Sequence, residues 1–306
     1  MFFYIAHQQT SLLRGAGLCL LALSAHDLHA QTQSETLRHM RETRTIVLAY
    51  REGLLPISGM DANRQTTGYA LELCLRIAEA TRLQLKLPQL KVEYLAVDGN
   101  NRFTALTERR ADIECGNTTN SAQRREKYAF SQPHLFASTR MLVRADSGIR
   151  NWPDLLNRRV AVLKGGTAVP QVRRRSELRA LNITLAEVNL LSEAIAMLQD
   201  GRVDAVVASD VSLLGRRAEM PRPETYIVTG EALSVEQYGL MMRKEDVDFK
   251  QIVNRELVRL FDSGEIYRIY DRWFMQPIDA RHASLNLPMS PLLKQAIRFP
   301  SDKALD

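Results

Sequence analysis

The sequence predicts an α/β protein in which one arrangement of strands and helices occurs twice. Short runs rich in β-branched residues alternate with longer amphipathic runs, and this order favours mostly parallel sheets covered by helices. The order begins near residue 45 and begins again near residue 159. A short repeated sequence joins the two halves. We therefore expect two lobes, each with a mostly parallel sheet flanked by helices.

The first half contains three predicted strands and two predicted helices. The strand-like runs are TIVLAY at 45–50, VEYLAV at 92–97 and DIECG at 112–116. The runs GYALELCLRIAEAT at 68–81 and RFTALTERR at 102–110 have helical character and connect the strands.

The second half repeats this order. Strand-like runs are RVAVLKGGTA at 159–168, DAVVAS at 204–209 and TYIVTG at 225–230, with the helical run SEAIAMLQDG at 192–201. Apolar residues then recur at helical spacing between residues 252 and 266, so helices should close the protein. The segment from Gln276 holds four prolines and little periodicity, which predicts a tail lying on the surface.

A nine-residue similarity supports the duplication. ALTERRADI begins at Ala105 and MLQDGRVDA begins at Met197. The matched pairs, each 204 − 112 = 92 residues apart, are Leu106 with Leu198, Arg110 with Arg202, and Asp112 with Asp204. Each copy predicts a helix that ends in Arg-x-Asp and leads into an apolar strand.

The first thirty residues are typical of a cleaved export signal. Arg14 precedes the apolar run at 15–25, and the segment ends at Ala30 before polar residues. No later run approaches the roughly 20 apolar residues that a membrane-spanning helix requires. We therefore expect an exported, soluble mature protein.

The charge pattern argues against nucleic-acid binding. The formal net charge is +6, but acidic residues are interleaved with basic ones along almost the whole chain. The dense cluster at 173–175 has no neighbouring aromatic residues that could stack on bases. We expect no nucleic-acid partner.

Two cysteines remain outside the export signal, Cys74 in a helical run and Cys115 at the end of a strand. Two cysteines alone cannot form a four-ligand zinc site. They could pair in an oxidising compartment, but sequence does not give their separation in space. Of the two alternatives we favour separately buried thiols.

Arginines follow three neighbouring strand ends of the first half. Open α/β sheets bind ligands at the carboxyl ends of their strands, and the three arginines there are Arg51, Arg102 and Arg124. A guanidinium group can hold a carboxylate with two hydrogen bonds, and free N–H groups expected at residues 119–121 would add donors. Three cations would repel one another in an empty site. The pattern favours a ligand with more than one negative group.

The second half offers small and acidic side chains at its strand ends. Thr167 follows the first strand, and Ser209 with Asp210 follows a later one. An acid such as Asp210 could pair with a ligand ammonium. Motifs for nucleophilic catalysis, phosphate loops and zinc helices are absent from the sequence, and nothing in it requires a cofactor.

These residues lie in blocks that resemble a known family. The sequence is similar to the periplasmic substrate-binding proteins of polar amino-acid ABC transporters, solute-binding protein family 3, and most closely to the glutamate/aspartate-binding branch. The resemblance rests on YREGLLPIS at 50–58, GYALELC at 68–74, NNRFTAL at 100–106, DIECGNTTNSAQRR at 112–125, AFSQP at 129–133, LQDGRVDAVVASD at 198–210, YGLMMRKED at 238–246, SGEIYRIYDRWF at 263–274 and PSDKALD at 300–306.

The resemblance implies a two-lobed periplasmic binding protein type II fold with a two-strand hinge near residues 138–144 and 237–243. It divides the chain into a signal peptide (1–30), the first part of lobe 1 (31–139), lobe 2 (140–240), the completion of lobe 1 (241–275) and a C-terminal tail (276–306). It also implies periplasmic localisation, a monomer, no cofactor, and delivery of an acidic amino acid to an inner-membrane permease.

The resemblance assigns a role to each candidate residue. Arg124 would bind the α-carboxylate with help from Thr119 and the backbone around Asn117. Arg51 and Arg102 would neutralise the side-chain carboxylate. Thr167 would contact the ligand from lobe 2, and Asp210 or a neighbour would receive the ammonium.

Four positions depart from that branch. Asn117 stands where serine is usual, Gly99 replaces a small hydroxyl residue, Leu191 falls where a histidine is often found, and Ser209 replaces the first of two acids. The choice between glutamate, aspartate and a related dicarboxylate therefore stays open. Alternatives to a carrier are a prephenate or arogenate dehydratase-like enzyme on the same scaffold, and a solute sensor.

Overall fold

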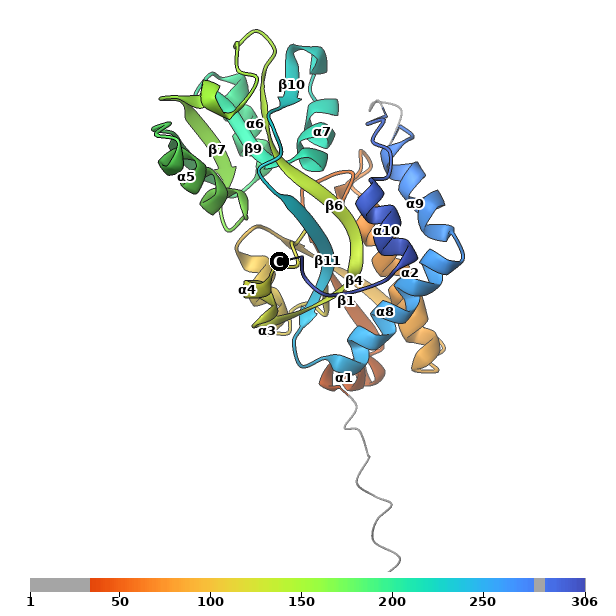
Figure 1. The fold of residues 1–306 in the computed structure, drawn as a ribbon. Helices are drawn as coiled ribbons and strands as arrows, with labels where there is room; N and C mark the ends of the chain where they lie inside the picture. Colours follow the sequence, from red (N-terminus) through yellow and green to blue (C-terminus); the bar gives the residue numbers. More distant parts are fainter. Residues whose placement is uncertain (1–33, 278–283, 306) are drawn as a thin grey trace, which may run out of the picture. The chain divides into compact units, whose positions relative to one another are not determined.

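A computed structural model describes residues 34–277 and 284–305 (Figure 1). The proposed export signal at 1–30 lies outside these residues. Within the described part, nine strands form a mixed sheet in the order β4-β1-β5-β11-β6-β9-β7-β8, with β10 also paired to β6. Their bounds are β1 Thr45–Arg51, β4 Lys91–Val97, β5 Ile113–Cys115, β6 Tyr128–Arg144, β7 Arg159–Leu163, β8 Thr184–Val188, β9 Ala205–Ser209, β10 Tyr226–Thr229 and β11 Val235–Arg243.

The sheet has two parallel groups of three strands. In the first half, β1 pairs in parallel with β4 and β5. In the second half, β7 pairs in parallel with β8 and β9. This confirms the predicted α/β class with mostly parallel sheets. The edge strand β8 was not predicted, because its residues are exposed or only half-buried and give little apolar signal.

Strands β6 and β11 connect the two halves. They pair antiparallel with each other, β11 also pairs with β5, and β6 also pairs with β9. Segments 138–144 and 237–243, predicted as the hinge, lie within these two strands. The division of the chain at 139/140 and 240/241 stays a prediction. A separate hairpin is formed by β2 (Gly59–Met60) and β3 (Thr66–Thr67).

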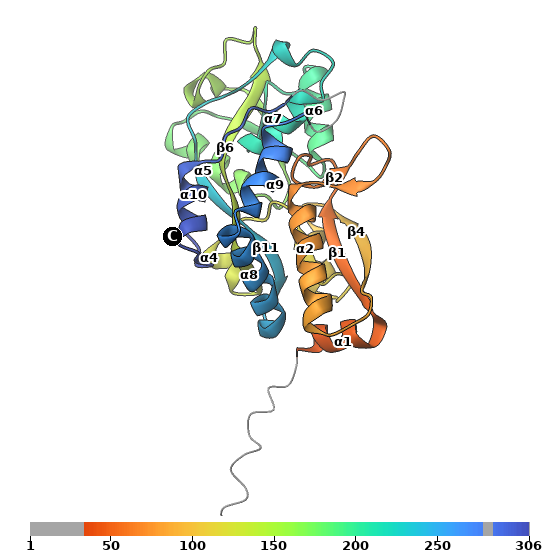
Figure 2. The same cartoon turned by 90° about the vertical axis from the view of Figure 1, so that its right-hand side faces the viewer.

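Helices cover the sheet, and α2, α8 and α9 pack together beside β1 (Figure 2). Their buried aromatic contacts include the rings of Tyr69, Tyr270 and Phe274. The α-helical bounds are α1 Glu35–Thr43, α2 Tyr69–Gln84, α3 Asn101–Thr107, α4 Ala122–Arg125, α5 Ala168–Leu178, α6 Leu191–Gln199, α7 Asp210–Ala218, α8 Val247–Asp262, α9 Glu265–Phe274 and α10 Pro291–Arg298, and two 3₁₀ helices span Trp152–Leu155 and Pro223–Thr225.

The C-terminal part differs from the irregular tail that was predicted, because it contains α10. This helix starts at Pro291 with Ser290 as its N-cap, and it buries Leu293 and Ile297. Only eight residues long, it offers too short a pattern for periodicity to detect. Within the described residues, no helix combines the length and apolar character needed to cross a bilayer.

The repeated sequence forms the same contacts in both halves. The carboxylate of Asp112 accepts from the backbone N–H of Val47 at 2.9 Å, and that of Asp204 accepts from the backbone N–H of Arg159 at 2.8 Å. The aspartate N–H groups in turn donate to the carbonyls of the same two residues. Each aspartate therefore joins the end of its helix to the first strand of its own half. This accounts for the spacing conserved between the two copies.

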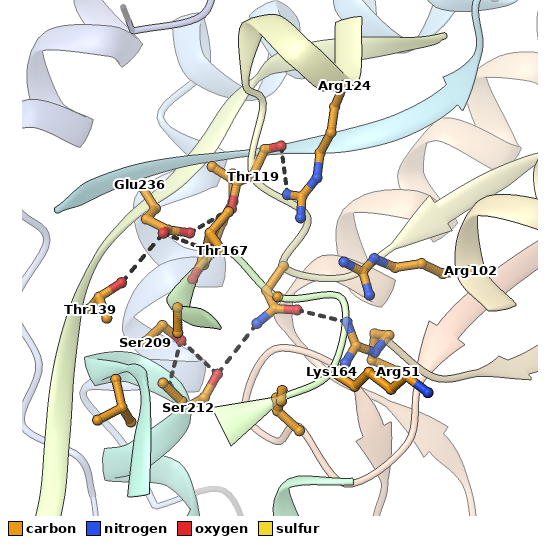
Figure 3. Close-up of a pocket in the computed structure, with 17 residues that line it drawn as sticks. Arg51, Arg102, Thr119, Arg124, Thr139, Lys164, Thr167, Ser209, Ser212 and Glu236 are labelled. Atoms are coloured by element: carbon orange, nitrogen blue, oxygen red, sulfur yellow. Dashed lines mark hydrogen bonds between the residues drawn. The ribbon is translucent and has the colours of Figure 1, made fainter. Parts of the chain in front are cut away.

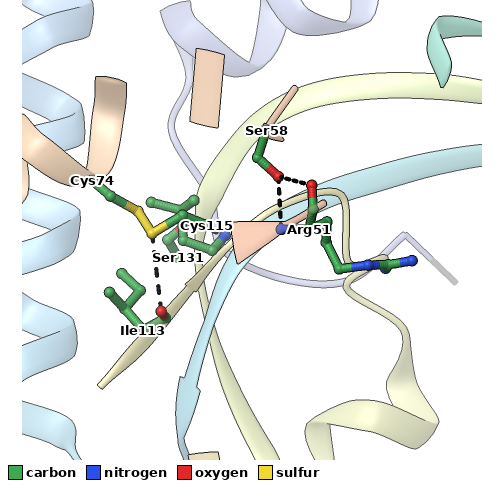
Figure 4. The surroundings of a disulfide bond; sticks show 7 residues. Arg51, Ser58, Cys74, Ile113, Cys115 and Ser131 are labelled. Atoms are coloured by element: carbon green, nitrogen blue, oxygen red, sulfur yellow. Dashed lines mark hydrogen bonds between the residues drawn. A yellow bond between two sulfur atoms is a disulfide. The ribbon is translucent and has the colours of Figure 1, made fainter. Parts of the chain in front are cut away.

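Cys74 and Cys115 form a disulfide, with Cα atoms 6.2 Å apart (Figure 4). The expectation of two separate thiols was wrong. The residues are 41 positions apart, but α2 packs on β5 and brings the two side chains together in the core. Cys115 ends β5, so the bond fixes the strand that leads directly into the segment 116–121.

His134 lies in β6 and is fully buried, as a packing residue should be. Its ring lies 5.7 Å from that of Tyr69, whose hydroxyl donates to the His134 carbonyl at 2.7 Å. Burial lowers the pKa of the imidazole from 6.5 to about 3, while the backbone of Gly116 acts weakly in the opposite direction. His134 is therefore neutral in the folded protein throughout the physiological range.

This buried imidazole should make stability fall with acid. Below pH 6.5 the unfolded chain binds a proton that the folded chain does not bind until about pH 3. The free energy of unfolding should therefore be undiminished above pH 6.5 and fall below it by up to about 1.4 kcal/mol per pH unit. When the pH is lowered from 7 to 5, the free energy of unfolding measured with urea should fall in both proteins. The fall should be smaller by about 2 kcal/mol in His134→Gln than in the wild type. Equal losses in both proteins would contradict this assignment.

Candidate functional site

A cavity lies at the carboxyl ends of the parallel strands, where the loops of both halves meet (Figure 3). It is lined by six of the seven residues predicted from the sequence: Arg51, Arg102, Asn117, Thr119, Arg124 and Thr167. Arg51 ends β1, and Arg102 lies in the first turn of α3. Arg124 comes from α4, which is a single turn with Ser121 as its N-cap.

The three arginines are held mainly by oxygens of neighbouring loops. Arg102 donates to the carbonyl of Gly99, and its second terminal nitrogen lies 3.3 Å from the carbonyl oxygen of Gly165. Arg124 donates to the carbonyl of Thr119 at 3.0 Å and lies 3.4 Å from the same Gly165 oxygen. Two guanidinium groups of the first half therefore share one carbonyl of the second half.

Phe103 supports the same two arginines and was missed by the sequence analysis. The guanidinium carbon of Arg102 lies 4.3 Å from the centre of its ring, and that of Arg124 lies 5.4 Å from it. These are cation–π distances. The aromatic face therefore helps to hold two like charges on one side of the cavity.

Burial makes this cluster electrostatically costly. Burial lowers the pKa of Arg102 well below its ordinary value; Arg51 and Arg124 lower it further, and Glu114 opposes them. Burial likewise lowers the pKa of Arg51 and of Arg124. Guanidinium groups stay protonated under such conditions, so the cavity is lined by positive charges that repel one another. An anion bound here would relieve that repulsion.

Glu114 supplies a buried negative charge behind the cavity. It lies in β5 and is fully buried, so burial raises its pKa, while Arg102 and Arg51 act to lower it. Its carboxylate runs beside Gly116: a Cβ there would stand 2.3 Å from the carboxylate oxygen and 3.0 Å from the Arg51 side chain. Glycine at 116 is what allows these opposite charges to lie against the loop.

Asn117 lies between the two halves. Its side-chain oxygen is 3.5 Å from a terminal nitrogen of Arg51, and its side-chain nitrogen is 3.5 Å from the hydroxyl of Ser212. The Ser212 hydroxyl also accepts from Ser209 at 2.8 Å. The amide at 117 therefore reaches further across the cavity than the serine expected there could.

Glu236 in β11 is the carboxylate of this cavity, and the sequence analysis did not find it. One of its oxygens accepts from Thr119 at 2.5 Å. The other accepts from Thr167 at 2.5 Å and from Gln171 at 3.0 Å, with the hydroxyls of Ser234 and Thr139 at 3.3 and 3.4 Å. Glu236 thus joins a threonine of each half.

A signal for Glu236 was present in the sequence. It lies two residues before Tyr238, and residues two apart on a strand face the same side. Both side chains line the cavity. Tyr238 begins the YGLMMRKED block on which the family resemblance rests.

Asp210 does not line the cavity, contrary to the prediction. Ser209 ends β9 and caps α7, so Ser209 faces the cavity and Asp210 is turned one position further. The Asp210 carboxylate accepts instead from the backbone N–H groups of Ser138 at 3.1 Å and Val211 at 2.8 Å. Burial raises its pKa, and these hydrogen bonds act to lower it. The acidic residue that lines the cavity is instead Glu236.

Leu191 and Gly99, two of the four positions that differ from the glutamate/aspartate-binding branch, lie in different parts of the structure. Leu191 starts α6 and is buried in the core of the second half. Gly99 touches the second half directly, because a Cβ there would stand 2.5 Å from the carbonyl oxygen of Lys164. A Cβ at Gly165 would stand 2.8 Å from the carbonyl oxygen of Gly99. Glycines at these two positions let the backbones approach.

The donor set suits an anion with a cationic group nearby. Guanidinium and hydroxyl groups match carboxylate oxygens, and one buried carboxylate can accept from an ammonium. Within residues 34–277 and 284–305, no cluster of three His, Cys, Asp or Glu side chains could hold a metal ion.

The chain is similar over most of its length to known binding proteins. Residues 46–276 match the family of bacterial extracellular solute-binding proteins, family 3. The chain is 33% identical to the L-glutamate/L-aspartate-binding protein of Pseudomonas aeruginosa, covering 93% of this chain and 95% of that protein. It is 29% identical to the glutamate/aspartate import solute-binding protein of Salmonella typhimurium, covering 94% and 97%.

A solved structure supports the same fold. An ancestral arginine-binding protein bound to glutamine aligns with a TM-score of 0.67 at 26% sequence identity. The alignment covers 75% of this chain and 97% of that one.

Adding a methyl group at Gly99 should weaken binding without unfolding the protein. In Gly99→Ala the new carbon would meet the Lys164 carbonyl, so the loops of the two halves would have to separate. Calorimetry with L-glutamate as the probe anion should show an affinity lower by about tenfold, or about 1.4 kcal/mol.

Gly201→Ala is the control. Gly201 has a positive φ of 68° and open space around it, so alanine there should cost stability and leave affinity unchanged. Wild-type affinity in Gly99→Ala would show that the contact at this glycine is not needed for binding.

Proposed function

Because the chain belongs to the bacterial extracellular solute-binding proteins, family 3, we propose that it captures an acidic amino acid, glutamate or aspartate, and delivers it to an ABC-type permease. Relatives that align over nearly the whole chain are named as glutamate/aspartate-binding or import proteins. The observation that carries the proposal is the cavity lined by three arginines, of which Arg51 and Arg102 are buried, and by one carboxylate.

The ligand's two carboxylates bind to different arginines. Arg124 holds the α-carboxylate, and the hydroxyls of Thr119 and Thr167 turn from Glu236 to donate to it. Arg51 and Arg102 hold the side-chain carboxylate. The positions support this division, since Arg124 donates to Thr119 whereas Arg51 lies beside Asn117 and away from Arg124 (Figure 3).

Glu236 receives the α-ammonium. It is the one carboxylate among the described residues that line the cavity, and hydroxyl donors can rotate away from it when a cation arrives. An ammonium gives it a full positive charge in place of neutral donors, and charge-assisted hydrogen bonds are the stronger kind.

The charges at the cavity favour an acidic amino acid. Four cationic side chains line it, Arg51, Arg102, Arg124 and Lys164, against one lining carboxylate, Glu236, with Glu114 buried behind them, so the sum is 4 − 2 = +2 when both carboxylates are ionised. Glutamate and aspartate carry two carboxylates and one ammonium, a net charge of −1. Binding either of them would reduce this positive excess.

Ligand contacts from both halves favour the form in which the halves are close together. The ligand selects this form to the extent that it binds it more tightly than the open one. We propose that the permease recognises this form, that the carrier works as a periplasmic monomer, and that residues 1–30 direct its export.

We further propose that the protein is a carrier and not a dehydratase. A dehydratase needs a general acid free to protonate a leaving hydroxyl. The cavity's Glu236 is engaged by several donors, and Asp210 faces backbone N–H groups away from the cavity. Turnover of prephenate or arogenate by the purified protein would overturn this part of the proposal.

A ligand panel tests the proposed specificity. Calorimetry on protein refolded free of ligand should give tight binding for L-glutamate or L-aspartate. Glutamine and asparagine should bind at least about tenfold more weakly, because each leaves Arg51 and Arg102 without a carboxylate. Arg124→Ala should abolish binding of both acids, and its unchanged affinity would contradict the assigned role. Absence of binding by the wild type would refute the proposed ligand class.

Glu236→Gln tests the ammonium contact with a matched pair of ligands. L-Glutamate should bind the variant about 10- to 100-fold more weakly, because a charged hydrogen bond is lost. The analogue 2-oxoglutarate has the same two carboxylates and no ammonium, so its affinity should change less. Equal losses for the two ligands would show that Glu236 shapes the cavity and does not pair with the ammonium.

A further inference from the structure

Residues 299–305 form a segment, here called the strap, that follows α10 and runs beside α4 and β11 (Figure 2). It has no regular secondary structure. Its hydrogen bonds nevertheless fix its path, and most of them are made to side chains whose neighbours in the sequence line the cavity.

Three side chains hold the strap by its backbone. Asn120 donates to the carbonyl of Asp302 at 3.0 Å, and Arg125 donates to the same oxygen. Gln237 donates to the carbonyl of Lys303 at 3.0 Å and accepts from the N–H of Leu305 at 3.1 Å. Asn120 and Gln237 are both buried, at 2% and 4% exposure, so their amide groups would lose partners if the strap left.

Each of these three residues is the neighbour of a cavity residue. Asn120 follows Thr119, Arg125 follows Arg124, and Gln237 follows Glu236. The two chain segments involved are also bonded to each other, because the N–H of Asn120 donates to the carbonyl of Gln237 at 2.8 Å.

The strap is anchored at a second place by α8. The carboxylate of Asp302 lies 2.6 Å from the ammonium of Lys250 and accepts from Asn254 at 3.2 Å. Partial burial acts to raise the pKa of Asp302, but these partners hold it below its ordinary value. Asp302 therefore joins α8 to the segment that carries Asn120 and Arg125, while the bonds to Gln237 in β11 are made by Lys303 and Leu305.

We propose that the strap is a positioning element of the ligand site: by bonding Asn120, Arg125 and Gln237 it holds Thr119, Arg124 and Glu236 in register for the amino-acid end of the ligand. The proposal for the strap rests on the proposed function only in that it takes the ligand to be an acidic amino acid. The strap itself does not touch the cavity. Its effect on affinity passes through the backbone of the two segments.

Thermodynamic linkage between ligand binding and strap docking can be measured. A strap that only stabilised the fold would not dock more tightly when ligand binds. If the docked strap raises ligand affinity by some factor, bound ligand must favour strap docking by the same factor. The N–H of Leu305, which donates to Gln237, reports docking through its rate of hydrogen exchange.

The experiment compares the wild type with a deletion of residues 300–306 and with Asp302→Ala. The deletion should weaken L-glutamate binding by about tenfold or more, and Asp302→Ala should weaken it less because the backbone bonds remain. Saturating L-glutamate should slow exchange at Leu305 in the wild type by about the factor lost on deletion. Asp200→Asn, which removes the exposed partner of Arg202 elsewhere in the second half, should leave affinity unchanged.

Hydrogen exchange of segment 117–125 in ligand-free protein separates this proposal from the proposed function. Deleting the strap should speed exchange at Asn120 and leave β7 and β9 unchanged, whatever ligand the protein binds. A wild type that ignores glutamate and aspartate would refute the ligand, and this exchange comparison would still decide the strap. Unchanged exchange at Asn120 with unchanged affinity would overturn the strap proposal. The proposal would also be overturned if the deletion weakened binding while saturating L-glutamate left hydrogen exchange at Leu305 of the wild type unchanged.

Discussion

The structure depends on gathering three guanidinium groups at one edge of a sheet, two of them buried and the third half-buried. Removing these cations from water is costly, as the lowered pKa of each shows, and the protein must offset that cost before any ligand arrives. It does so with loop carbonyls, with an aromatic ring between two of the arginines, and with Glu114 behind the third. Gly116 is small because the carboxylate of Glu114 passes against it.

The same charges connect the two halves of the molecule. Arg102 and Arg124 of the first half reach the Gly165 carbonyl of the second, while Glu236 bonds threonines from both. Neither set of contacts satisfies its charges fully, since cations face neutral oxygens and a carboxylate faces hydroxyls. An acidic zwitterion supplies the missing opposite charges to both sets at once. Ligand recognition and approach of the halves are therefore parts of a single electrostatic balance.

The sequence predicted the parts of this protein that local patterns determine. Parallel strands have continuous apolar runs, so β1, β5, β7 and β9 were found, and the position of an arginine after a strand end is visible in one dimension. The repeat was visible too, since each copy must place one aspartate against the start of its own first strand.

The features that the sequence did not predict depend on the direction in which a side chain points and on packing between elements far apart in the sequence. Asp210 and Ser209 are adjacent, and only the start of α7 decides which of them faces the cavity. Glu236 lies in a strand far along the chain from the other site residues, and the one signal for it was its spacing of two residues from Tyr238. The pairing of Cys74 with Cys115 required knowing that α2 lies on β5. The strap has no periodicity, and its contacts with Asn120 and Gln237 are visible only in the structure.

The disulfide also makes the structure of the binding site depend on the compartment in which the chain folds. Cys115 is followed at once by Gly116 and Asn117, so the bond to α2 tethers the segment that carries the hydroxyl and amide groups of the site. Thiols stay reduced in the cytosol and pair in oxidising compartments. A copy kept in the cytosol would therefore lack this tether, and the segment would be fixed to α2 only in an oxidising compartment.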